Sequence, residues 1–173
     1  VRLFPFIKRY PRLYHQANSQ MTHALSQDEQ GHIWVASYQG GTGGISVLER
    51  DTVNTIKSPP HQWLPGTYSN ARGILFFAEG NKGGYWFGPD GEARQVVDSA
   101  AFYFAFRSSD QRVYLGSALQ GLWSIDDVGI HTAGNKDFRK INKNGLDKMH
   151  ILTINEDQFG NIWGASGTKM FVY

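Results

Sequence analysis

The sequence predicts an all-β protein in which one sheet-forming unit is repeated. Turn residues recur about every 8–12 residues between short apolar and aromatic runs, as in chains of many short strands. The 20 glycines are spread as single residues and pairs, which is typical of turns and not of a flexible linker. No segment has a convincing helical periodicity. In addition, one ten-residue sequence motif, called the phrase below, occurs near both ends of the chain.

The phrase Asp-x-x-Gly-x-Ile-Trp-x-Ala-Ser occurs at Asp28–Ser37 and again at Asp157–Ser166. The two copies share six of ten positions and start 157 − 28 = 129 residues apart. Each predicts a β-hairpin, because an Asp carboxylate accepts backbone N–H bonds at the start of a turn and Gly tolerates positive φ at its end. In the strand that follows, Trp34 and Ala36 share one face. The small residues after each Trp permit close approach of another sheet.

Two weaker copies lie between these phrases. One places Trp86 in the Trp position, with Gly83 and Gly88 in the places of the turn Gly and the first Ala; the other places Tyr114 there. The four anchors are then spaced by 52, 28 and 49 residues, with a mean of 129/3 = 43. That mean fits the ~40–50 residues of one four-stranded propeller blade. The 28-residue interval is too short for a blade and counts against the register of the middle copies.

Further short strands are expected in order along the chain, about fifteen in all. One segment between two repeats, residues 59–73, is the longest irregular stretch. These strands include 25–27, 32–37, 44–51, 52–57, 85–87, 93–97, 102–107, 112–117, 121–127, 138–142, 152–156, 161–166 and 169–173.

Burial explains why a phrase should recur. One small twisted sheet cannot bury both of its faces, whereas similar sheets stacked face to face can, so the core positions recur once per sheet. The sequence therefore predicts one fragment, residues 1–173, of an all-β partial β-propeller with about three to four blades of four antiparallel strands. The expected repeat units are about 21–57, 71–98, 102–142 and 149–173, the last one incomplete.

The phrase resembles the two-component regulator propeller repeat, Asp-x-x-Gly-x-(Ile/Leu)-Trp-(Ile/Val)-Gly-Thr followed by a Gly-Leu strand. The first copy matches at Asp28, Gly31, Ile33, Trp34 and Val35, and Gly121-Leu122 resembles the following strand. The family's Gly-Thr is replaced by Ala36-Ser37, Gly116-Ser117 and Ala165-Ser166, which are conservative departures. The likeness covers about Met21 to Tyr173 and is strong at both ends.

The resemblance implies a function. Members of this family are typically extracytoplasmic sensor portions of bacterial histidine kinases, hybrid regulators or diguanylate cyclases, with larger propellers. We therefore expect a non-catalytic, periplasmic sensor module of a longer protein, which binds a ligand or partner and relays the change to an output domain outside this chain. A small molecule or an oligosaccharide is the expected ligand. The unpaired end sheets predict self-association.

Composition excludes several other classes of protein. The chain has no cysteine, which rules out disulfides, thiol catalysis and cysteine zinc sites. The formal net charge is +2, and the basic stretch Lys136–Lys148 also carries two Asp, so nucleic acid is not an expected partner. No apolar run approaches the ~20 residues that cross a bilayer, and no membrane contact is expected within this segment.

Catalytic, metal and cofactor residues are not predicted, so the chain itself is not expected to be an enzyme. The six histidines lack HExxH spacing, and no G-x-S-x-G elbow or facing carboxylate pair stands out. The recurring position of the repeat tryptophans favours core packing over sugar stacking. Loops on propeller faces carry binding, so His61, Trp63 and Tyr68 in the irregular stretch are the candidate ligand-binding residues.

Two alternatives stay open. The first is a propeller scaffold for protein interaction with no small ligand. The second is an enzyme similar to the streptogramin lyases, which are propellers with comparable repeats, a divalent metal and a catalytic His. The lyases are larger, and this chain has no obvious His-x-x-x-Glu pairing near a blade end.

Overall fold

A computed structural model describes residues 21–39, 42–49, 52–56, 63–78, 80–98, 100–143, 145–167 and 169–173 of the chain. Of residues 21–24, 37–39, 42–43 and 63–67 only the backbone is described. These residues form four antiparallel sheets in which each strand pairs with the next one along the chain.

Three sheets have four strands and the last has three. The first contains β1 (Met21–Gln27), β2 (Ile33–Gln39), β3 (Thr42–Glu49) and β4 (Thr52–Ile56). The second contains β5 (Trp63–Asn70), β6 (Gly73–Ala78), β7 (Gly84–Phe87) and β8 (Ala93–Val97). The third contains β9 (Phe102–Arg107), β10 (Arg112–Ser117), β11 (Leu122–Asp126) and β12 (Arg139–Lys140). The fourth contains β13 (Thr153–Glu156), β14 (Ile162–Ser166) and β15 (Lys169–Val172).

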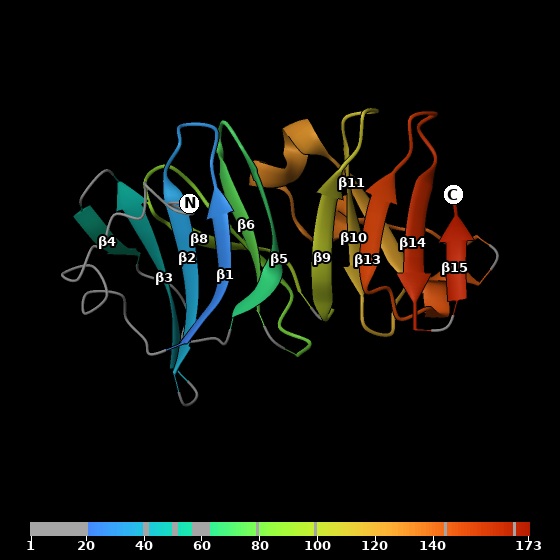
Figure 1. The fold of residues 1–173 in the computed structure, drawn as a ribbon, viewed down its shortest axis with the longest axis horizontal. Coiled ribbons are helices and arrows are strands. Elements are labelled where there is room, and N and C mark those ends of the chain that lie inside the picture. The colour runs from blue at the N-terminus through green and yellow to red at the C-terminus, as the bar shows by residue number, and fades with distance from the viewer. Residues whose placement is uncertain are drawn as a thin grey trace, which may run out of the picture.

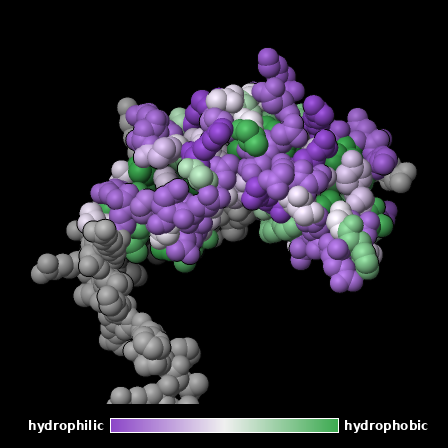
Figure 2. All heavy atoms as spheres, turned by 90° about the horizontal axis from the view of Figure 1, so that it is seen from above, coloured by the Kyte–Doolittle hydropathy of each residue, from purple (hydrophilic) through white to green (hydrophobic). Residues whose placement is uncertain are grey.

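The four sheets stand side by side in chain order, from β1–β4 at one end to β13–β15 at the other (Figure 1). The first strands of neighbouring sheets contact one another, β1 with β5, β5 with β9 and β9 with β13, so they form the inner line of the row. Seen from above, the row is curved (Figure 2). This arrangement confirms the predicted all-β, partial propeller with sheets as blades.

The core lies between the sheets, in three clusters of buried side chains. Each sheet uses alternate residues of its strands for its two neighbours, as the period of two requires. Between the first and second sheets lie Trp34, Ala36, Ile45, Val47, Ile74, Phe76, Ala78, Tyr85 and Phe87. The second and third sheets enclose Leu75, Phe77, Trp86, Val97, Phe102, Val113, Leu115 and Ile125, among others. The third and fourth sheets enclose Tyr114, Leu122, Leu146, Ile151, Ile154 and Ile162.

Register shows which residue occupies the Trp position of each sheet. The Trp position is the residue of a sheet's second strand that pairs with the residue two places before the hairpin turn. Trp34, Tyr114 and Trp163 occupy it in the first, third and fourth sheets. In the second sheet it is occupied by Leu75, which pairs with Tyr68. The prediction that Trp86 holds it is wrong, because Trp86 lies in the third strand, β7, paired with Leu75. With Leu75 as the anchor, the spacings become 75 − 34 = 41, 114 − 75 = 39 and 163 − 114 = 49. The short interval therefore disappears.

The segment 59–73, expected to be irregular, contains strand β5, the innermost strand of the second sheet. Its pairing with β6 shifts register between Leu64 and Tyr68, and Pro65-Gly66 lies at that shift. Because Pro cannot donate to a sheet ladder and Gly often marks a bulge, the strand carries turn residues in its interior. The second sheet thus begins at Trp63, ahead of the expected repeat start at residue 71.

Short 3₁₀ helices are a further departure from the expected structure. They are η1 (Asp127–Thr132), η2 (Asn135–Asp137) and η3 (Leu146–Lys148), and all three lie beside the third sheet. They contain six, three and three residues, which is one or two turns each and too short to give a periodicity to detect. No helix among the described residues is long and apolar enough to cross a membrane.

Candidate functional site

The turn of the first phrase is organised by the carboxylate of Asp28. Its Oδ1 accepts the backbone N–H groups of Gln30 and His32 at 3.0 and 2.9 Å, as the sequence predicts. Its Oδ2 accepts the indole N–H of Trp34 at 2.8 Å and lies 2.9 Å from Nδ1 of His32. Burial alone would raise the pKa of Asp28, but the bonds from Trp34 and His32 outweigh it and lower the pKa. The carboxylate therefore holds the indole and the imidazole in place.

The second phrase repeats this geometry. Asp157 Oδ1 accepts the N–H groups of Phe159 and Asn161, and its Oδ2 accepts the indole N–H of Trp163 at 2.8 Å. The bond from the Asn161 side chain, then that from Trp163, lowers the pKa of Asp157 to about 2. Sequence reasoning missed the bond from indole to carboxylate. The available signal was the constant six-residue interval from Asp to Trp in both copies.

The surroundings of the two tryptophans differ. Trp34 is 4% exposed beneath the second sheet, where its ring lies 6.4 Å from that of Phe87. Trp163 is 41% exposed, because it points away from the third sheet. The expected core packing of the repeat tryptophans is therefore correct for Trp34 and Trp86 and wrong for Trp163 among the described residues.

A groove opens between the first and second sheets, beside the first phrase. It has a volume of about 300 Å³ and contains the imidazole of His32, whose side chain is 37% exposed. Both apolar and polar side chains line the groove, and a second hollow of about 540 Å³ shares Gln30, His32, Glu49 and Asn54 with it. The lining comes from Asp28, Gln30, His32, Trp34, Val47, Glu49, Asn54, Ile56, Ala71, Gly73, Pro89, Asp90 and Gly91.

This groove offers hydrogen-bonding groups that suit a small polar ligand. Glu49 and Asp90 supply exposed carboxylates, and Gln30 and Asn54 supply amides that both donate and accept. Such convergent polar groups in a concave site fix a ligand's orientation. Sequence reasoning missed the groove, because its residues come from four separate segments and form no local motif.

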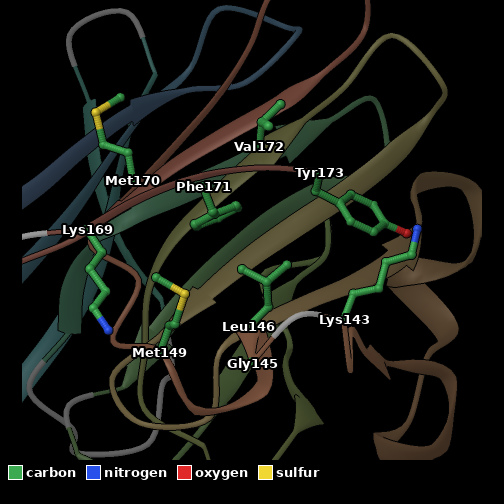
Figure 3. Close-up of a pocket in the computed structure, with 9 residues that line it drawn as sticks. All are labelled: Lys143, Gly145, Leu146, Met149, Lys169, Met170, Phe171, Val172 and Tyr173. Atoms are coloured by element: carbon green, nitrogen blue, oxygen red, sulfur yellow. The ribbon is translucent and has the colours of Figure 1, made fainter.

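A larger hollow, about 620 Å³, lies beside strand β15 (Figure 3). Leu146 and Met149 face Phe171 across it, and Lys143 Nζ lies 5.2 Å from the centre of the Tyr173 ring. Strand β15 pairs only with β14 among the described residues, whereas the third strand of every other sheet also pairs with a fourth. We attribute this hollow to the unpaired strand edge and prefer the groove beside His32 as the ligand site.

The three predicted ligand residues fall in different places. His61 lies outside the described residues, and Trp63 begins β5 with only its backbone described. Tyr68 is 7% exposed between the second and third sheets. It is not part of the groove beside His32. A ligand role for these three residues stays a prediction.

Tyr68 instead takes part in a polar network around Asp127. Its hydroxyl donates to Oδ1 of Asp127, which also accepts the Asn70 amide at 2.8 Å, and Arg107 Nε lies 2.9 Å from Oδ2. Burial, followed by the bond to Asp127, raises the pKa of Tyr68 above its ordinary value. Asp127 is buried and fully bonded, so this network joins the second sheet to the third.

Histidines do not gather in the described part of the chain. His32 bonds to Asp28 in the first sheet, His131 lies within 3.3 Å of Arg72, and His150 stacks on Tyr103 with ring centres 5.5 Å apart. Among the described residues, no group of three His, Cys, Asp or Glu side chains could hold a metal ion.

Comparisons with known proteins agree with the resemblance. The family model described as two component regulator propeller matches residues 16–39, which include the first phrase. This match confirms the resemblance to that repeat. No curated protein matches the chain.

Solved structures share the fold at low sequence identity. The chain aligns with the extracellular domain of a protein described as a hybrid two-component system from B. thetaiotaomicron, with TM-score 0.66, 14% identity and coverage of 90% of this chain and 21% of that one. The extracellular domain of a one-component system from the same organism gives TM-score 0.65, 14% identity and coverage of 91% and 24%. This chain thus spans about a quarter or less of those domains.

A lyase shares the fold as well. The catalytically inactive H270A virginiamycin B lyase from Staphylococcus aureus, solved with quinupristin, aligns with TM-score 0.62, 13% identity and coverage of 90% of this chain and 56% of that one. At these identities the likenesses show the propeller fold alone.

Proposed function

We propose that this chain is a non-catalytic sensor module of a bacterial two-component type signalling protein. It lies outside the cytoplasm, in the periplasm, binds a ligand or partner, and relays the event to an output domain outside the chain. The observation that carries the proposal is the match of the regulator propeller repeat to residues 16–39. The fold likeness to extracellular domains of signalling proteins supports it.

The groove beside His32 supplies the ligand site in this proposal. It lies between two sheets, so a bound molecule would contact both of them. A ligand that binds one relative placement of the sheets better than another shifts the population toward that placement. This is how binding at the groove would be relayed along the row.

A binding screen tests the ligand site. Thermal unfolding of the chain is measured with a panel of monosaccharides, oligosaccharides and small polar metabolites, because a ligand that binds the folded state raises the unfolding temperature. We expect a hit whose affinity falls about tenfold or more in Asn54→Ala, equivalent to ~1.4 kcal/mol. Lys82→Ala, an exposed change outside the groove, is the control. Equal affinity in both variants would place the ligand elsewhere.

The lyase-like alternative rests on the fold likeness to virginiamycin B lyase. Incubation of the chain with quinupristin and Mg²⁺, followed by mass spectrometry, separates the two functions. A sensor module leaves quinupristin intact, whereas its conversion would favour the enzyme. A chain that binds only proteins, and none of the small molecules in the panel, would favour the interaction scaffold.

A further inference from the structure

The outer face of the last sheet exposes apolar side chains at a face that is covered in the other sheets. Trp163, Met170 and Val172 lie on this face and are 41, 74 and 56% exposed. Side chains at the Trp position of the first and third sheets, Trp34 and Tyr114, are only 4 and 3% exposed, because the next sheet lies over them. The last sheet therefore carries a face built to be covered by another sheet.

The opposite end of the row carries the complementary face. In the second, third and fourth sheets, the residue before the Trp position packs on the preceding sheet and is at most 3% exposed: Ile74, Val113 and Ile162. The equivalent Ile33 in the first sheet is only half-buried, as is Val35 beside it. Leu25, paired with Val35 on the same face, is 66% exposed.

The same pairing of faces recurs three times inside the molecule. The Trp-position face of one sheet meets the Ile-position face of the next, as Trp34 meets the face of Ile74. The two end faces correspond to the two halves of this interface. Each includes residues of one copy of the repeated sequence, Asp28–Ser37 or Asp157–Ser166. A contact between them would continue the packing already present.

We infer that two copies of this chain associate head to tail, with the Trp163 face of one copy packed on the Leu25 and Ile33 face of the other. The contact joins different surfaces of the two copies, so it either closes a ring or continues as an open row. The occupant of the end face is thus a second copy of the chain, and the apolar area removed from water drives the association.

Sedimentation of single-site variants tests this inference. Met170→Lys blocks the last sheet and Leu25→Lys blocks the first, and both side chains are exposed enough for the fold to tolerate the change. Leu119→Lys, at a 78% exposed residue in a turn of the third sheet, is the matched control. Val172→Lys replaces Met170→Lys if circular dichroism shows that the latter is unfolded.

The unmodified chain and the Leu119→Lys control are expected to self-associate as concentration rises, and each blocked variant is expected to remain monomeric. A mixture of the two blocked variants should form a dimer, because each retains the half that the other has lost. A monomeric unmodified chain would overturn the inference. So would a dimer of either blocked variant alone, since that would show like faces pairing.

Discussion

At the scale of single residues, one carboxylate does most to define the repeated hairpin. Asp28 and Asp157 each satisfy two backbone N–H groups of the turn and one indole N–H of the following strand. The turn and the packing of the Trp are therefore set by the same side chain. In the third sheet Tyr114 takes the Trp place, and its hydroxyl lies 3.4 Å from Asp110.

Removing this carboxylate should destabilise the first hairpin. Asp28→Ala leaves the buried indole N–H of Trp34 without its acceptor, and an unsatisfied buried donor costs about 1–3 kcal/mol. Urea unfolding of Asp28→Ala should show that loss, while the neighbouring Glu29→Ala, at an exposed position, should leave the unfolding free energy nearly unchanged. Equal stability of the two variants would contradict this role of Asp28.

Acid should weaken the last hairpin. Hydrogen bonds lower the pKa of Asp157 from 3.8 to about 2. A carboxyl whose pKa is lowered by folding stabilises the folded state above its unfolded pKa, and that contribution is lost as pH falls through the folded pKa. Between pH 4 and 2, Asp157→Asn should therefore lose less stability than the unmodified chain, as followed by urea unfolding at each pH. Parallel pH profiles would show that Asp157 makes no such contribution.

At the scale of elements, small residues set how closely neighbouring sheets approach. A Cβ at Gly116 in β10 would lie 2.8 Å from Cγ2 and 2.9 Å from the carbonyl oxygen of Ile151, just before β13. The sequence indicated this role for the small residues after the Trp position. Asp127 adds a polar link between sheets two and three.

Enlarging Gly116 should push the third and fourth sheets apart. Gly116→Ala is expected to cost about 1–3 kcal/mol, as overpacking of a close contact does. Gly134→Ala, where a Cβ meets no atom within 4 Å, is the matched control and should not destabilise the chain. Thermal unfolding of both variants checks the difference. If Gly116→Ala is as stable as the unmodified chain, the space between the third and fourth sheets accommodates the added methyl group, contrary to this prediction.

The link through Asp127 should depend on several partners together. Tyr68→Phe removes one hydrogen bond and is expected to cost about 1 kcal/mol, since Asn70 and Arg107 still hold the carboxylate. Asp127→Ala leaves three groups without their acceptor and should cost more. Urea unfolding compares the two variants, and an equal loss would show that Tyr68 alone carries the link. Ligand affinity of Tyr68→Phe also tests the predicted binding role of Tyr68.

At the scale of the whole molecule, the sequence predicted the structure correctly where the same buried positions recur from sheet to sheet, and it failed where they do not. The phrases at Asp28 and Asp157 predicted the repeated sheets, because every sheet must offer a Trp-position face to the next. The second sheet was misplaced, since Leu75 fills that position without the phrase and Trp86 lies in the next strand. The groove beside His32 could not be predicted, because folding alone brings its four segments together.

The central claim is that Trp34 and Trp163 occupy the same place in two sheets, one inside the row and one at its open end. The indole N–H signals in ¹⁵N–¹H NMR spectra, assigned with Trp34→Phe and Trp163→Phe, test it directly. Asp28→Asn should shift the Trp34 signal and not that of Trp163, and Asp157→Asn the reverse. In the monomeric Leu25→Lys variant, a soluble paramagnetic agent should broaden the Trp163 signal and leave the Trp34 signal sharp. The claim would be contradicted if an indole signal did not shift on replacement of the Asp in its own hairpin, or if the Trp34 and Trp163 signals broadened equally.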